Sequence, residues 1–199
     1  LFAGAQTGNV IFMALHFAKG NLEKAVEFLI PIISFMIGQI FIYCFRNFFQ
    51  RRGHKGYIHS SLLMLFIMIM LIVFLPFFDY HFIVVTLAFF AAIQSDTFQR
   101  LRGFSYATIM MTGNVKNAPR LLIEGLVQRD RELLVRGFLL FLIIFSFMLG
   151  VGMSTYFTQF VKKSALVPLI LPLSYINYVL FKEEHNVIDV VKSKIRKIK

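Results

Sequence analysis

The chain alternates between long apolar runs and short basic connections. A membrane-spanning helix needs about 20 consecutive, mostly apolar residues. Four runs of roughly this length carry no charge, and a fifth carries only the carboxylate of Asp96. We therefore expect five membrane-spanning helices, at Phe28–Phe45, Ser60–Phe78, Phe82–Gln99, Gly137–Val161 and Ser164–Phe181.

The pattern of the first half recurs in the second. Thr7-Gly8-Asn9 matches Thr112-Gly113-Asn114 at an offset of 105 positions, and Ser34–Gly38 matches Ser146–Gly150 at an offset of 112. The two halves therefore differ by an insertion of seven residues. Duplication inside a membrane protein commonly places a site at the interface between the repeats.

The first copy of the motif lies close to Leu1, and the chain does not begin with Met. We expect a further helix ahead of it, as the 82–99 run precedes the second copy. Each half would then hold three helices, and an odd number per repeat orients the two halves oppositely. The predicted fold is an all-α membrane protein, a polytopic bundle of two inverted three-helix repeats, with five spans here and six in the full chain. Repeat one covers residues 1–80 without its first helix and repeat two covers 81–181, so residues 1–181 form one membrane domain.

Composition agrees with a membrane protein. Hydrophobic residues make up 58% of the chain, against roughly 45–50% in soluble domains, and the mean hydropathy is +0.72. The net charge is +11, but no nucleic-acid-binding motif accompanies it, so we expect no nucleic-acid partner. Seventeen of the 21 basic residues fall in two connections and the C-terminal tail, on one predicted face, which the positive-inside rule makes cytoplasmic. The C-terminus would then be cytoplasmic, with the first motif toward the outside and the second toward the inside.

Each Thr-Gly-Asn motif combines a hydroxyl, an amide and a glycine that can break a helix. The apolar segment Gly103–Val115 is too short to span, so we expect a half-helical or re-entrant segment that ends in the second motif. Broken helices are tolerated at membrane depth only where protein or a water-filled cavity surrounds them. The alternative is that Thr and Gly pack a helix crossing while Asn ties two helices together.

Polar residues also gather just before the second motif, where Gln94 and Asp96 are the candidate ligands. An ionisable residue inside a span is costly and commonly functional. Alternatively, Asp96 is an interfacial residue paired with Arg100 or Arg102. Gln39, in the middle of an apolar run, is expected to hydrogen-bond across helices. The predicted substrate-binding residues are thus Thr7, Gly8, Asn9, Gln94, Asp96, Thr112, Gly113 and Asn114.

The sequence contains no paired carboxylates on a membrane helix, no Gly-x-Ser-x-Gly, no His-Glu-x-x-His and no phosphate-binding glycine loop. Its histidines lack metal-ligand spacing. We therefore expect no catalytic residues, no metal and no cofactor. Residues 182–199 form a basic cytoplasmic tail. Ile188, Val191, Ile195 and Ile198 would give this tail one apolar helical stripe, suited to anionic lipid headgroups; a disordered tail is the alternative.

Three runs of residues resemble the YoaK-like family of bacterial membrane proteins, a domain of unknown function. They are Ala5-Gln6-Thr7-Gly8-Asn9, Gln94-Ser95-Asp96 with Gly103 and Thr108 after it, and Met111-Thr112-Gly113-Asn114. The resemblance covers residues 3–181 and implies a multipass protein of the bacterial inner membrane, without an established substrate. The family's first helix, with its Gly and Asp, has no counterpart here.

Two functions follow as hypotheses. The first is a small-solute or ion transporter, or a permease-like channel, with its site between the two motifs. The second is a non-transporting membrane scaffold, or a protein that binds a partner or lipid. A polar cavity touching both motifs would favour transport, whereas a dry interface would favour the scaffold. The sequence leaves open whether the protein forms a homo-oligomer.

Overall fold

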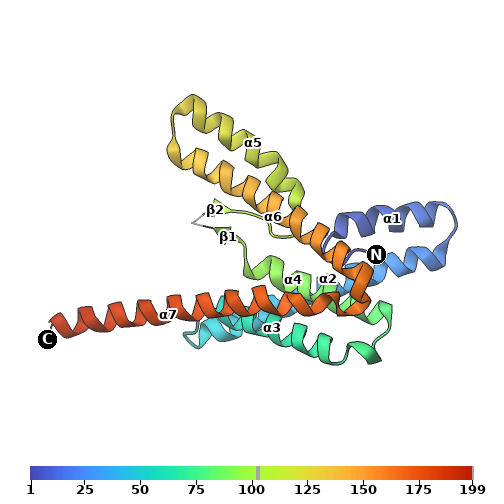
Figure 1. The fold of residues 1–199 in the computed structure, drawn as a ribbon, viewed down its shortest axis with the longest axis horizontal. Helices are drawn as coiled ribbons and strands as arrows, with labels where there is room; N and C mark the ends of the chain where they lie inside the picture. Colours follow the sequence, from blue (N-terminus) through green and yellow to red (C-terminus); the bar gives the residue numbers. More distant parts are fainter. Residues whose placement is uncertain (102–103, 199) are drawn as a thin grey trace.

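The computed structural model describes residues 1–101 and 104–198, with side chains for residues 1–99, 106–161 and 164–184. This part of the chain is almost entirely helical (Figure 1). Its α-helices are α1 (Gln6–Ala18), α2 (Leu22–Arg51), α3 (Gly56–Val73), α4 (Tyr80–Thr97), α5 (Met111–Gln128), α6 (Arg131–Val161) and α7 (Ile170–Ile198). The remaining elements are the 3₁₀ helices η1 (Leu75–Phe77) and η2 (Lys162–Leu169), and the short antiparallel strands β1 (Arg100–Leu101) and β2 (Phe104–Ser105).

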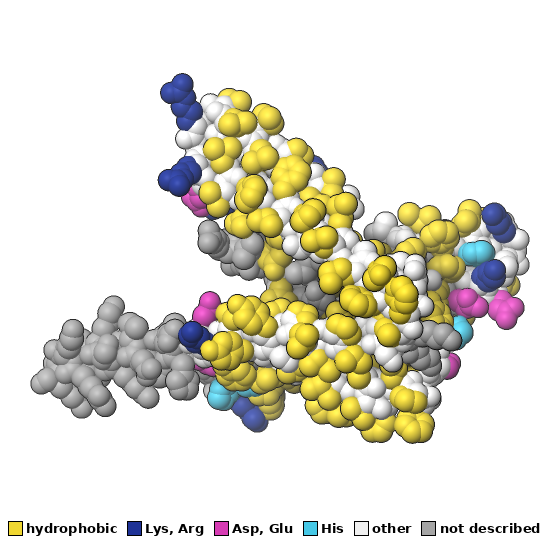
Figure 2. All heavy atoms as spheres, in the orientation of Figure 1, with side chains coloured by type: hydrophobic (Ala, Val, Ile, Leu, Met, Phe, Trp, Pro, Cys, Tyr) yellow, Lys and Arg dark blue, Asp and Glu magenta, His cyan; other side chains and the backbone are white. Residues whose placement is uncertain are grey.

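Within the described residues, four helical segments are long and apolar enough to cross a membrane: α2, α3, α6 and the segment Ser164–Glu184. Four of the five expected spans therefore correspond to such helices. The helix α4 is not among the helices that are long and apolar enough to cross a membrane. Its last turns carry the polar residues Gln94, Ser95 and Asp96. Hydrophobic side chains cover much of the surface seen in Figure 2, as expected for a protein that faces lipid.

Two helical hairpins project from the centre of the molecule (Figure 1). In the first, α1 turns into α2 through Gly20, whose φ of +73° favours glycine. In the second, α5 turns into α6, and the Asp130 carboxylate accepts a hydrogen bond from the Glu132 backbone N–H at 2.8 Å, which caps α6. These hairpins come from matching positions in the two halves of the sequence.

The helices α2 and α4 run side by side in the same direction. The Ser34 hydroxyl donates to the Val85 carbonyl at 2.7 Å. One turn later, Gly38 lies so close to α4 that a Cβ built on it would be 2.7 Å from the Cβ of Ala92. Small residues thus allow the two helices to approach closely, as membrane helices commonly do.

The helices α3 and α7 pack against each other in opposite directions (Figure 1). The Asn177 amide donates to the Ser61 carbonyl at 3.3 Å. Earlier on α7, Leu173 lies in one buried cluster with Met64 and Met68, which come later on α3. The cluster also contains Ile42 and Ile93, so α2, α3, α4 and α7 share one apolar core.

One expectation about the motifs is wrong. The second motif does not end a half-helix, because α5 begins at Met111 and places Thr112-Gly113-Asn114 in its first turn. The first motif likewise lies in the first turn of α1. The motif therefore marks the start of a helix after a non-helical segment, and the break precedes it. In the tail, the backbone of α7 continues to Ile198, while the predicted apolar stripe concerns side chains outside the described ones.

Candidate functional site

The side chain of Asn9 holds the backbone of the segment that precedes α1. Its Oδ1 accepts a hydrogen bond from the Phe2 N–H at 3.0 Å, and its Nδ2 donates to the Phe2 carbonyl at 2.7 Å. A third bond runs from Nδ2 to the Gln6 side chain at 2.9 Å. The side chain is fully buried, so these bonds satisfy polar groups that water does not reach.

Asn114 makes the same pair of bonds in the second half. Its Oδ1 accepts from the Ala107 N–H at 3.2 Å, and its Nδ2 donates to the Ala107 carbonyl at 2.6 Å. In both halves the partner lies seven residues before the asparagine. We call this two-bond arrangement the asparagine clamp. Each clamp fixes a non-helical segment against the first turn of the helix that follows it.

The other motif residues lie outside the clamps. Thr7, Thr112 and Gly113 are exposed, and a Cβ built on Gly113 would meet nothing within 4 Å. Gly8 lies against the ring of Phe2. A Cβ built on Gly8 would be 3.0 Å from Cδ2 of that ring. The motifs therefore use their amides internally and leave the threonine hydroxyls at the surface.

The two clamped segments meet near the centre of the molecule. A Cβ built on Gly4 would lie 2.6 Å from Cγ2 of Ile109, and 3.9 Å from the Cβ of Ala91 on α4. Ile109 also packs on a buried apolar cluster of Phe35, Ala91 and Ala92. This crossing is apolar, and no residue of either Thr-Gly-Asn motif belongs to that cluster.

A hollow of about 390 Å³ lies beside the second clamped segment, between α4 and α6. Its polar lining consists of Gln94, Thr108 and Ser146. The Thr108 hydroxyl is buried and has no hydrogen-bond partner among the described residues. Hydrophobic side chains complete the wall: Leu139, Leu142, Ile143 and Phe147. The hollow can therefore offer hydroxyl and amide groups to a small molecule within an otherwise apolar wall.

Tyr106 is the titratable residue nearest to the second clamp in sequence. Burial raises the pKa of its phenol above the ordinary value. Burial therefore disfavours the phenolate form of Tyr106 further.

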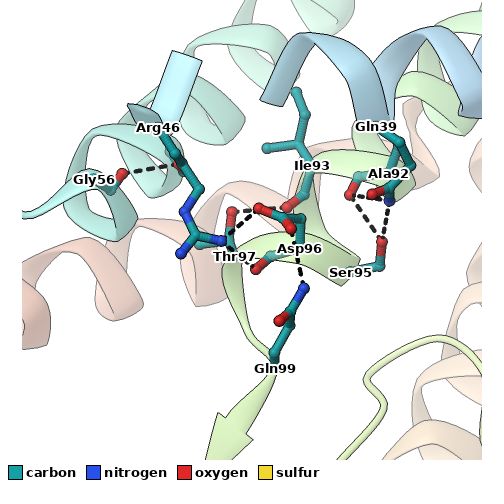
Figure 3. A network of polar contacts seen from close by, with 10 residues as sticks. Gln39, Arg46, Gly56, Ala92, Ile93, Ser95, Asp96, Thr97 and Gln99 are labelled. Carbon is teal, nitrogen blue, oxygen red and sulfur yellow. Dashed lines mark hydrogen bonds and ion pairs between the residues drawn. The ribbon is translucent and has the colours of Figure 1, made fainter. Parts of the chain in front are cut away.

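Asp96 pairs with Arg46 of α2, which joins the ends of two parallel helices (Figure 3). The guanidinium donates to the carboxylate at 2.5 Å and to the Asp96 carbonyl at 2.9 Å. The amide of Gln99 adds a bond to the other carboxylate oxygen at 3.0 Å. Asp96 is therefore held in an ion pair. Of the two partners expected from the sequence, Arg102 lies outside the described residues and so does the side chain of Arg100.

The sequence reasoning missed Arg46. It is the first charged residue after the apolar run that forms most of α2, so its position at a helix end was visible in the sequence. Its partner was not, because the pairing depends on the parallel packing of α2 and α4. Gln39 lies two turns before Arg46 on α2. Its side-chain amide donates to the Ala92 carbonyl at 3.0 Å and to the Ser95 hydroxyl at 2.7 Å (Figure 3). Its expected role in bonding across helices is confirmed.

Within the described part of the chain, no group of three or more His, Cys, Asp or Glu side chains could hold a metal ion. Gln94 lines the hollow, whereas Asn9 and Asn114 lie in separate clamps and Asp96 lies in the ion pair. The structure therefore separates the predicted site residues, and the other motif residues lie outside the hollow, the clamps and the ion pair.

A comparison with protein families gives one match, and it covers most of the chain. Residues 1–178 match the family described as protein of unknown function (DUF1275). No curated protein and no solved structure matches the sequence.

Proposed function

The chain belongs to the DUF1275 family, and we propose that this member moves a small solute or ion across a membrane. The proposed path runs past the hollow lined by Gln94, Thr108 and Ser146, all residues of repeat two, beside the segment whose Ile109 touches the first half. The observation that carries this proposal is the buried hydroxyl of Thr108 in the wall of that hollow, which has no hydrogen-bond partner among the described residues. A buried polar group without a partner is unfavourable, and a solute that reached it would supply the missing hydrogen bond.

We propose further that the halves are inverted repeats, with α4 as a fifth span. Three arrangements support this. Matching hairpins occur in both halves, α3 and α7 run in opposite directions, and the counterparts Gly4 and Ile109 touch. Equivalent residues touch only near the axis that relates them. In inverted-repeat transporters, solutes bind at the interface between the repeats, near non-helical breaks.

The predicted site residues take different roles in this proposal. Gln94 and Thr108 contact the solute, because they line the hollow. Asn9 and Asn114 position the two crossing segments, because their amides are committed to the clamps. The exposed hydroxyls of Thr7 and Thr112 extend the polar path toward either side of the membrane. Asp96 locks α4 to α2 through Arg46.

The proposed location is the bacterial inner membrane, as the resemblance to the YoaK-like family implies. The C-terminus is proposed to be cytoplasmic because most basic residues lie on its side. Its basic tail would contact anionic headgroups.

A membrane scaffold is the second candidate, and one observation favours it. The crossing of the two clamped segments is dry, with Gly4, Ala91 and Ile109 in close contact. A hydrophobic crossing of this kind stabilises a fold without providing a path. On this alternative, the hollow would be a packing defect and its polar groups would have no ligand.

Flux through liposomes containing the purified protein separates the two candidates. We suggest urea, glycerol, sodium acetate and potassium chloride as probes, with light scattering as the readout of swelling. Transport predicts swelling above that of protein-free liposomes for at least one probe, and its loss in Ser146→Leu, which fills the hollow. Thr86→Val is the matched control, because its hydroxyl bonds within α4 to the Phe82 carbonyl. Swelling that matches protein-free liposomes for every probe would contradict transport.

A further inference from the structure

One face of α6 matches the best-covered face of α2 but lacks its cover. On α2, Pro31, Ser34, Phe35, Gly38 and Ile42 are all buried. The sequence repeat places Ile143, Ser146, Phe147, Gly150 and Ser154 at the matching positions of α6. Apart from Ile143, which is half-buried, these counterparts are exposed. The same face is therefore covered in one half and open in the other.

The cover on α2 is the helix α4. Gly38 meets Ala92 and the backbone of Phe89, and Ser34 donates to the Val85 carbonyl. At the matching point of α6, a Cβ built on Gly150 would meet no described atom within 4 Å. In the most apolar 18 residues of α2, 28% of the residues are buried inside the protein. The corresponding fraction in α6 is only 11%.

Contact with lipid alone does not explain the small residues on this face of α6. A glycine inside a helix costs about 1 kcal/mol relative to alanine, and Gly150 lies on this face with no described atom within 4 Å of a Cβ built on it. Small residues are useful where a second helix approaches closely. The Ser146 hydroxyl, like that of Ser34, could then donate to a carbonyl of that second helix.

We propose that an apolar membrane helix built like α4 packs on the α6 face formed by Ile143, Ser146, Phe147, Gly150 and Ser154. Its chemistry follows from α4: a small side chain opposite Gly150, and a carbonyl that accepts from Ser146. Ser154 matches Ile42 of α2, and Ile42 lies in one buried cluster with Ile93 of α4. The docked helix should therefore carry an aliphatic side chain opposite Ser154.

The docked helix would also complete the hollow. Ile143, Ser146 and Phe147 belong both to the open face and to the hollow's wall. A helix on this face would therefore close the open side of the hollow, next to Thr108. The inference stands on packing alone and does not depend on transport.

Cross-linking tests the proposal in lipid nanodiscs. The probe is a synthetic peptide with the sequence of residues 80–97 and the substitution Ile93→Cys. It is added to the chain carrying Ser154→Cys in a Cys44→Ser background, since Cys44 is exposed and would react. The matched control replaces Tyr156, which is exposed and two residues further along α6. Successive helical residues are about 100° apart, so its cysteine points away from the proposed face.

The proposal predicts a disulfide at Ser154→Cys that forms about tenfold faster than at Tyr156→Cys, because docking raises the effective thiol concentration. Adding Gly150→Leu should reduce the faster rate to that of the control, since the larger side chain blocks the crossing. This leucine points into open space, so the chain should still fold. Equal rates at both positions would overturn the proposal. Efficient linkage of two Ser154→Cys chains in the absence of peptide would overturn it too, by identifying a second copy as the occupant.

Discussion

Gly4 and Ile109 occupy matching positions in the two halves of the chain, and they touch. A Cβ built on Gly4 would lie 2.6 Å from Cγ2 of Ile109. Each belongs to a non-helical segment that an asparagine clamp holds in place. The contact therefore joins the two halves at the point where their equivalent segments cross.

Gly4→Ala should destabilise the protein, because the added methyl group collides with the branched side chain of Ile109. Overpacking of this kind costs about 1–3 kcal/mol. Ile109→Ala in the same chain should relieve the collision and recover part of the loss. Thermal melting of the two single variants and the double variant measures this coupling. Gly113→Ala is the control, because nothing lies near that Cβ position and melting should not fall.

Loss of an asparagine clamp should lower stability in either half. Asn9→Leu and Asn114→Leu each leave a backbone N–H and a carbonyl without their partners, at a cost of about 1–3 kcal/mol per unsatisfied group. Melting curves should therefore shift down for both variants. If both retain the melting temperature of the parent, the clamps do not hold the segments.

Asp96→Ala should be more damaging than removal of the whole ion pair. The single change leaves the Arg46 guanidinium, which is only partly exposed, without its carboxylate. A hydrogen bond to a charged group contributes about 1.5–3 kcal/mol. The double variant Arg46→Met, Asp96→Ala should melt at a higher temperature than Asp96→Ala alone. Identical melting of the single and double variants would show that the pair contributes little.

Thr108→Val tests the hollow with almost no change of volume. The substitution removes a hydroxyl without a described partner, so stability should stay constant or rise slightly. Solute flux should fall, because the proposed contact is lost. The combination of unchanged melting and reduced flux distinguishes a ligand from a packing residue. Thr86→Val, outside the hollow, should leave flux unchanged.

The sequence predicted the helices better than their partners. The uncharged runs correctly located most of α2, α3 and α6, because a long uncharged apolar run is favourable as a helix in the apolar interior of a membrane. The start of α5 was misplaced because the apolar run before it continues into the motif, so hydropathy alone does not mark where the helix begins. The bond between Asn114 and Ala107 depends on a non-helical segment folding back over seven residues. The pairing of Asp96 with Arg46 depends on two helices packing in parallel. Neither contact produces a repeating pattern of polar and apolar residues, so a single sequence does not reveal it.

Inverted halves place the turns of the two hairpins on opposite sides of the membrane. Lys19 lies in the first turn and Gln128 ends α5 just before the second, and both are exposed. Labelling of single cysteines at these positions with a membrane-impermeant thiol reagent, in intact cells of a Cys44→Ser strain, tests this most directly. Our account predicts that Lys19→Cys reacts in intact cells and that Gln128→Cys reacts only after the membrane is opened. Labelling of both cysteines from the same side would contradict it.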